Sequence, residues 1–205
     1  MIGPMTATPE TRPRRRSEPR NRLLATATQV FYAKGIHAVG IEEIVAAAEI
    51  TRSTLYRHFP SKDDLVVGYL QAASEYERQA VAEALAPDLT PADAVRAVAR
   101  SVVAQLSNPA YRGCAFLNAA AEFPDAEHPV HGAVLEHRAW FAALVLDLFE
   151  AVGRATPDGG TSPDRLAALF VMLRDGAMTS GCLGDPRTVG ATFQAGVEEL
   201  LATAG

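Results

Sequence analysis

The segment from Thr51 to His58 has the residue types and the spacing to bind DNA. Leu55 is its only apolar residue, and Phe59 follows four residues later, so these two side chains can anchor a helix whose other faces stay exposed. An arginine can donate two parallel hydrogen bonds to guanine, and polar or cationic side chains bind backbone phosphates. We therefore predict DNA contacts from Thr51, Arg52, Ser53, Thr54, Tyr56, Arg57 and His58.

The residues before this segment predict a short supporting helix. Ile41, Ile44, Val45 and Ala48 recur at the spacing of one helical face, and that face should pack inward. Thr51 then offers a side-chain oxygen where a second helix must begin. A helix, a tight turn and a polar helix form the arrangement that places a recognition helix in the major groove.

The string ITRSTLYRHFPSKDDL, preceded by IEEIVAAAE, resembles the DNA-binding signature of TetR-type (TetR/AcrR) transcriptional regulators. The resemblance covers Arg20 to about Leu70. It implies a three-helix DNA-binding domain, a phosphate contact from Lys62, and a connection from the fourth helix to a helical body.

Two positions depart from the pattern of the resembled family. Glu49 stands in the turn where the family most often has Gly, and Gly40 stands where a Ser or Thr usually caps the second helix. If the turn needs a left-handed backbone, Glu costs about 1 to 2 kcal/mol relative to Gly. A cost of this size is compatible with the predicted helix-turn-helix.

The charge of the chain is divided unevenly along its length. Residues 1–62 hold ten Lys and Arg against five Asp and Glu, a net charge of +5, whereas residues 63–205 hold nine against nineteen, a net charge of -10. This asymmetry is typical of a basic end that meets phosphates and an acidic body that stays away from them. A solvated charged face would explain the basic cluster equally well if the motif were absent.

The composition is that of an ordinary globular chain. Of the 205 residues, 48% are hydrophobic and 21% are charged, and no uninterrupted apolar run is long enough for a membrane span. The N-terminus carries charges and prolines where a signal peptide needs an apolar stretch, so we expect a cytoplasmic protein without a membrane partner. Cys114 and Cys182 are too few for a disulfide framework.

Helical periodicity, caps and breakers predict an all-α fold of about nine helices in two domains. Residues 1–19, rich in Pro and Arg, should form a disordered basic arm. Residues 20–66 should form the helix-turn-helix domain, and residues 67–205 a larger helical ligand-binding and dimerisation domain. The clearest helices after the recognition helix are Lys62 to about Ala86, Pro91 to Leu106, His131 to Val152, Pro163 to about Gly181 and Pro186 to Ala202.

The body has the composition of a ligand pocket. Small-molecule sites in helical proteins combine inward apolar and aromatic residues with a few polar groups. The candidates are Phe116, Leu117, Asn118, Phe123, Trp140, Phe141, Phe170, Arg174 and Met178, in which Asn118 and Arg174 supply the polar points. Each aromatic residue, taken singly, could equally be part of a plain core.

Cys114 and the histidines allow weaker alternatives. Cys114 could be a catalytic thiolate with His128, His131 or His137 as base, but nothing in the sequence positions them. A metal site formed with Glu136 lacks a paired Cys motif. A redox role for Cys114 or Cys182 would need an exposed thiol of low pKa. We therefore assign no catalytic residue, no metal and no cofactor.

The last two helices predict a homodimer interface. Leu166 to Leu173 is apolar at every position, and one body can cover such a helix on one side only. The stripe formed by Val189, Phe193, Val197, Leu200 and Leu201 offers a matching face for a two-fold interface. Phe193→Glu should then yield monomers.

These features together indicate a sequence-specific DNA-binding transcriptional regulator, and the resemblance implies a repressor released from its operator by a small-molecule ligand that moves the fourth helix. The alternative is a helical small-molecule carrier or enzyme that retains an unused DNA-binding fold. A gel-shift experiment with the chain's own upstream DNA separates the two.

Overall fold

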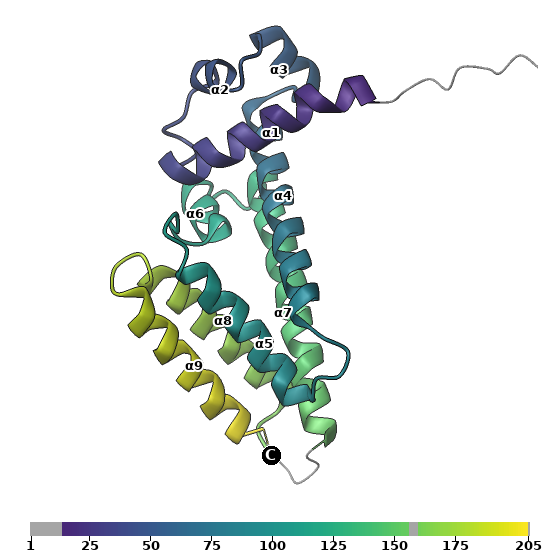
Figure 1. Cartoon of the computed structure of the whole chain (residues 1–205), viewed down its shortest axis with the longest axis vertical. Coiled ribbons are helices and arrows are strands. Elements are labelled where there is room, and N and C mark those ends of the chain that lie inside the picture. Colours follow the sequence, from purple (N-terminus) through teal and green to yellow (C-terminus); the bar gives the residue numbers. More distant parts are fainter. Residues whose placement is uncertain (1–13, 156–159, 205) are drawn as a thin grey trace, which may run out of the picture.

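The structure, a computed structural model, describes residues 14–155 and 160–204, which form nine α-helices and no strand. The first three helices form one end of the molecule, α4 leads from them into the body, and the remaining helices form a bundle at the other end (Figure 1). The helices are α1 Arg14–Lys34, α2 Ile41–Ala47, α3 Arg52–His58, α4 Lys62–Ala84, α5 Pro91–Leu106, α6 Ala115–Glu122, α7 Pro129–Ala155, α8 Pro163–Ser180 and α9 Pro186–Ala202. The predicted all-α fold is confirmed.

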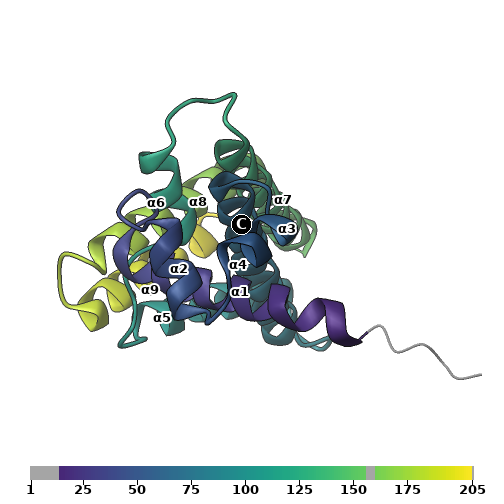
Figure 2. The same cartoon turned by 90° about the horizontal axis from the view of Figure 1, so that it is seen from above.

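The N-terminal helices pack around a small apolar core at the end seen in Figure 2. Leu23 of α1, Ile44 of α2 and Leu55 of α3 are fully buried in it. Gly68 lets α4 approach this core closely, because a Cβ atom at Gly68 would lie 3.0 Å from the ring of Phe59. The recognition helix is therefore fixed by the anchors that the sequence predicted.

The first helix begins earlier than predicted. It starts at Arg14, inside the predicted arm of residues 1–19, so residues 14–19 belong to α1 and not to the arm. Arginine and glutamate are good helix formers, and α1 continues through Pro19, its sixth residue, although a proline inside a helix donates no amide to the preceding turn. The other arm residues, 1–13, lie outside the described residues.

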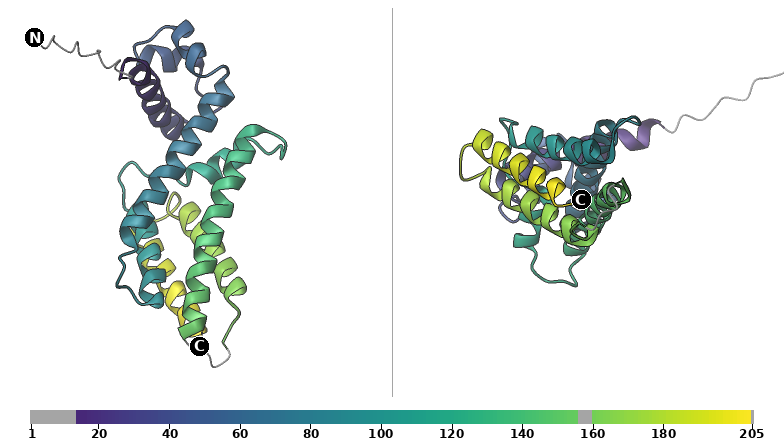
Figure 3. Two further views of the ribbon diagram at one scale, coloured as in Figure 1. Left: turned by 90° about the vertical axis from the view of Figure 1, so that its right-hand side faces the viewer. Right: turned by 90° about the horizontal axis from the view of Figure 1, so that it is seen from below.

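In the body, α5 and α8 pack against the long helix α7, α9 packs against α5 and α8, and α4 contacts both α5 and α7 (Figure 3). Its core contains an aromatic cluster in which Phe170 lies near Phe141, Phe149 and Phe193. No helix in the described ranges is long and apolar enough to cross a membrane.

The stripe of α9 that was predicted to face a second copy is instead part of this core. Phe193 is 3% exposed, with its ring 5.6 Å from that of Phe170, and Val197, Leu200 and Leu201 are also buried within the chain. A helix of this amphipathicity must bury one face, but the sequence does not say against which neighbour. Phe193→Glu is therefore expected to unfold the body and not merely to separate two copies.

Candidate functional site

The turn between α2 and α3 contains one residue with a left-handed backbone, at the position where the resembled family most often has Gly. Glu49 has a φ of 52°, which makes it the only non-glycine residue with positive φ in the described ranges. The amide of Ile50 donates to the Val45 carbonyl (3.1 Å) and the amide of Glu49 to the Ala46 carbonyl (3.2 Å), the pair of bonds that ends a helix in a Schellman motif. This turn sets the angle at which α3 leaves α2.

The recognition helix presents its polar side chains outward. The Thr54 amide donates to Thr51 Oγ1 (3.2 Å) and so caps the helix, while Leu55 and Phe59 are buried. The seven predicted DNA-binding residues of this segment fall into two groups by exposure. Thr51, Arg52, Ser53, Tyr56 and Arg57 are exposed, and Thr54 and His58 are half-buried.

The two arginines of α3 differ in their surroundings. Arg52 pairs with Glu42 of α2 (2.7 Å) and lies over the ring of Tyr56, and these two neighbours raise the pKa of Arg52. Arg57 has no ion pair or hydrogen bond with any described residue, so it can reach a base or a phosphate without breaking a contact. Lys62, half-buried at the first position of α4, follows the Ser61–Asp64 capping box.

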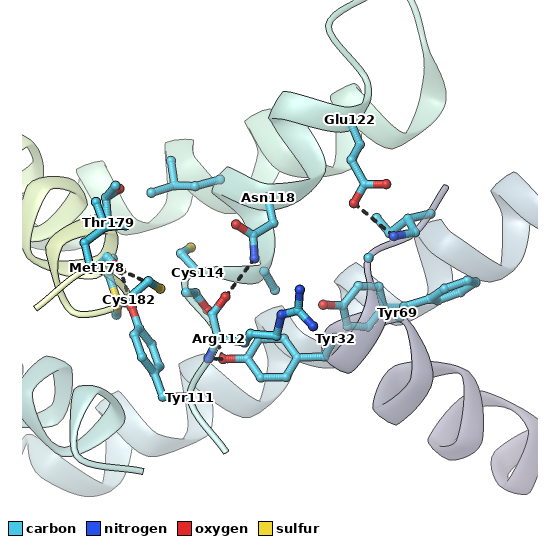
Figure 4. Close-up of a pocket in the computed structure, with 17 residues that line it drawn as sticks. Tyr32, Tyr69, Tyr111, Arg112, Cys114, Asn118, Glu122, Met178, Thr179 and Cys182 are labelled. Atoms are coloured by element: carbon cyan, nitrogen blue, oxygen red, sulfur yellow. Dashed lines mark hydrogen bonds between the residues drawn. The ribbon is translucent and has the colours of Figure 1, made fainter. Parts of the chain in front are cut away.

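Two adjoining cavities lie beneath the DNA-binding domain. The first, of about 520 Å³, is lined from α1, α4, α6, α8 and the loops beside them, and the second, of about 620 Å³, from α1, α4, α5 and α6. Figure 4 shows the first of them. The residues that line both are Tyr32, Tyr69, Tyr111, Gly113, Cys114 and Ala115.

The predicted ligand residues divide between these cavities and the core. Leu117, Asn118 and Met178 line the first cavity and Phe116 lines the second. The remaining five line neither cavity: Phe123, Trp140, Phe141, Phe170 and Arg174. Apolarity alone does not separate a side chain that fills a core from one that borders a void.

Sequence reasoning missed the contribution of α1 and α4. Tyr32 of α1 and Tyr69 of α4 line both cavities, although both helices had been assigned to the DNA-binding domain or its connection. A phenol hydroxyl on an otherwise apolar helix face was the available signal, because such a group needs a polar partner or a cavity.

A buried polar network joins α4, α7 and α8 next to the second cavity. Arg174 Nη2 donates to Glu77 Oε1 (3.1 Å), and His137 Nε2 lies 2.9 Å from Glu77 Oε2 in a contact that lacks hydrogen-bond geometry. Burial by itself raises the pKa of Glu77. The contact with His137 and the charge of Arg174 outweigh burial and hold this pKa below its ordinary value.

Two polar contacts hold the DNA-binding domain against the body. The carboxylate of Glu122, at the end of α6, accepts from the amides of Ile36 (2.9 Å) and His37 (2.6 Å) in the α1–α2 loop. The Tyr32 hydroxyl accepts from the Arg112 amide (2.9 Å) and donates to the Gly113 carbonyl (2.9 Å). A movement of the loop before α6, or of α6 itself, therefore acts directly on α1 and on the α1–α2 loop of the DNA-binding domain.

The alternatives built on Cys114 gain no geometric support. Its sulfur lies 3.4 Å from Arg174 Nη1, whereas the three histidines contact Asp63, the Phe123 carbonyl and Glu77. In the described part of the chain no three His, Cys, Asp or Glu side chains are grouped to hold a metal ion.

Comparison with known proteins matches both parts of the chain. Residues 23–68 match the family described as bacterial regulatory proteins, tetR family, and residues 91–195 match the tetracyclin repressor-like C-terminal domain. The crystal structure of SCO4454, a TetR-family transcriptional regulator from Streptomyces coelicolor, superposes with a TM-score of 0.86 at 50% identity, covering 92% of this chain and 97% of that one.

Two curated relatives match more locally. The HTH-type transcriptional regulator LmrA of Bacillus subtilis is 28% identical over 89 residues, which are 43% of this chain and 47% of LmrA. The HTH-type transcriptional activator FasR of Mycolicibacterium smegmatis is 43% identical over 56 residues, 27% of this chain and 26% of FasR. The chain thus spans about half or less of these two relatives.

The capped recognition helix, the helical body and the matches to both family domains all indicate the same family. The chain belongs to the TetR family of bacterial transcriptional regulators, and its function is DNA-binding regulation of transcription.

Proposed function

We propose that the protein is a cytoplasmic repressor that binds an operator as a homodimer and leaves it when a small molecule occupies the cavities beneath the DNA-binding domain. The observation that carries this proposal is the position of the cavities. They are lined by α1 and α4, the two helices that support and connect the recognition helix. A ligand there acts on the DNA-binding domain without intermediate elements.

Release requires the ligand to favour one arrangement of the domains. Taking a protein from 99% to 1% binding-competent needs about 5.5 kcal/mol of differential affinity. A ligand that separates the loop before α6 from α1 would weaken the Tyr32 contacts, and a shift of α6 would pull the α1–α2 loop through Glu122. Either movement changes the position of α3 relative to α4.

The dimer in this proposal forms through the outward faces of α8 and α9. In α8, Leu166, Ala167 and Phe170 are buried, so the apolar run is covered on one side as predicted. Leu169, Met172 and Leu173 remain exposed at 37%, 69% and 38%. A second copy covers this face and supplies the second recognition helix that a two-fold operator needs.

The test is binding of the full chain to labelled DNA from upstream of its own coding sequence, measured by fluorescence anisotropy at several salt concentrations. Arg57→Ala should weaken binding about 5- to 150-fold, because a lost bidentate base contact costs about 1 to 3 kcal/mol. Arg100→Ala, which removes an exposed arginine from α5, is the matched control and should bind normally.

The alternative of a carrier or enzyme with an unused DNA-binding fold predicts no sequence preference and no effect of Arg57→Ala. Repression is tested separately by transcription in vitro from the bound promoter, since FasR is named an activator. Increased transcription on addition of the protein would overturn the repressor assignment but not the assignment of DNA binding.

A further inference from the structure

Three tyrosines line both cavities: Tyr32, Tyr69 and Tyr111. Of these three, Tyr69 is the one whose hydroxyl has no hydrogen bond to a described residue. The Tyr32 hydroxyl is hydrogen-bonded to the backbone at residues 112 and 113. The Tyr111 hydroxyl donates to the Met178 carbonyl (2.6 Å). Tyr69 makes no hydrogen bond with any described residue, although its side chain is 3% exposed. Figure 4 shows Tyr69 reaching from α4 toward the other residues that line the first cavity.

The Tyr69 oxygen is not fully enclosed by protein atoms, so the hydroxyl reaches the cavity space and not the packed core. Because Tyr69 lines both cavities, an acceptor atom of a ligand in either of them can take this free hydrogen bond. Burial and the nearby Tyr32 raise the pKa of Tyr69, so its hydroxyl stays protonated near neutral pH and acts as a donor.

The carboxylates that line the cavities already have partners within the chain. Glu122 accepts two backbone amides, and Glu77 is paired with Arg174. Arg112 also lines the first cavity, but it is exposed, where water screens its charge. A charged ligand would thus lose its hydration without finding an unpaired buried counter-charge.

We propose that Tyr69 determines which ligand the cavities accept, and that this ligand is an uncharged, mainly apolar molecule with a carbonyl oxygen that accepts a hydrogen bond from the Tyr69 hydroxyl. Apolar contacts come from Phe31, whose ring centre lies 5.9 Å from that of Tyr69, and from Leu117 and Met178. This inference rests on the proposed role of the cavities as the ligand site.

The test uses three dyes of different charge on the full chain. Nile red is uncharged and carries a ring carbonyl, 8-anilinonaphthalene-1-sulfonate is an anion, and rhodamine 6G is a cation. Nile red should bind saturably at one site per chain with blue-shifted emission, at least tenfold more tightly than either ion.

Two variants separate the contribution of the Tyr69 hydroxyl from that of its ring. Tyr69→Phe keeps the ring and its packing, and should weaken Nile red binding about three- to tenfold, the loss of one neutral hydrogen bond. Ser162→Ala removes an exposed hydroxyl that lines neither cavity and caps no amide, and it should bind Nile red as the original chain does. Thermal denaturation of each variant checks that the fold is retained.

Two outcomes overturn the inference: equal Nile red affinity of Tyr69→Phe and the original chain, or tighter binding of either ionic dye. Anisotropy with upstream DNA on the same samples distinguishes this failure from failure of the proposed function. Intact DNA binding with no Tyr69 effect refutes only the ligand assignment. Tyr69-dependent Nile red binding that leaves the DNA complex undisturbed up to saturation supports the ligand assignment and contradicts release by cavity ligands.

Discussion

Glu49 holds the left-handed position of the helix-turn-helix, where a side chain is strained and glycine is not. The recognition helix depends on this turn and on the anchors Leu55 and Phe59, so its exposed residues are displayed at an angle that a few local contacts set. Two predictions concern single residues at this site.

Glu49→Gly should raise the free energy of unfolding by about 0.5 to 1 kcal/mol, because relief of the left-handed strain exceeds the entropy that glycine adds to the unfolded chain. Glu49→Ala is the control, since it removes the same charge but keeps a Cβ atom. Urea denaturation of both variants gives the comparison. An equal gain in both would mean that the carboxylate, and not the backbone angle, sets the effect.

Lys62→Ala should weaken binding to every DNA sequence to a similar extent and lower the slope of log affinity against log salt by about one. The reason is the loss of a single phosphate contact at the beginning of α4. Lys62→Arg keeps the charge and should keep the slope. A changed sequence preference with an unchanged slope would contradict a phosphate contact.

Helix α4 is the element that connects the two domains. Its first turn lies beside the recognition helix, its middle lines both cavities, and Glu77 near its end is paired with residues of α7 and α8. Helix α6 makes the second connection through Glu122. The two predictions at this scale address each connection in turn.

Glu77→Gln should lower the free energy of unfolding at pH 7 by about 3 kcal/mol, because Arg174 loses its buried partner. The folded-state pKa of Glu77 lies below its unfolded value, so its stabilisation is complete above the unfolded pKa and is lost as pH falls through the folded pKa. The difference between the two proteins should therefore shrink below about pH 4.

Denaturation curves from pH 7 down to pH 3 measure this difference, and Glu83→Gln, on the exposed side of α4, is the control. A difference that stays constant over the whole range would show that the ionisation of Glu77 does not contribute to stability.

Glu122→Ala should speed hydrogen exchange at the amides of Ile36 and His37 about tenfold, because both lose a charged acceptor. Glu127→Ala, in the loop after α6, is the matched control and should leave both amides unchanged. Exchange measured by NMR or mass spectrometry gives the answer. Unchanged protection at both amides would mean that the loop is held by other contacts.

At the scale of the whole molecule, α3 lies at one end and α8 lies in the body at the other (Figure 1). Helix α8 carries the exposed apolar side chains Leu169, Met172 and Leu173. One recognition helix alone reads a short sequence, so pairing of two copies adds both affinity and specificity.

Met172→Glu should convert the proposed dimer to a monomer and weaken operator binding at least tenfold, because a charge in an apolar interface is desolvated without a partner. Leu135→Glu changes a leucine of α7 that is 50% exposed and should leave the dimer intact. Sedimentation velocity at micromolar concentration measures both variants. A dimeric Met172→Glu would place the interface on another face.

The sequence by itself determined most of the helices, several of their caps and the residues that anchor the predicted recognition helix. Thr51, Ser61, Thr90 and Asp185 cap their helices through amides three residues ahead, and Leu55 with Phe59 anchors α3. Such features depend on neighbours within one or two helical turns, and the chain order therefore contains all the information they need.

Only the tertiary structure decided which apolar residues border a cavity and which fill a core. Glu122 meets Ile36 across 86 positions, Glu77 meets Arg174 across 97, and Phe193 turns toward Phe170 instead of toward a second copy. Helical periodicity says that a face is buried, but the partner that buries it is set by how distant helices pack, and one sequence read locally does not contain that choice.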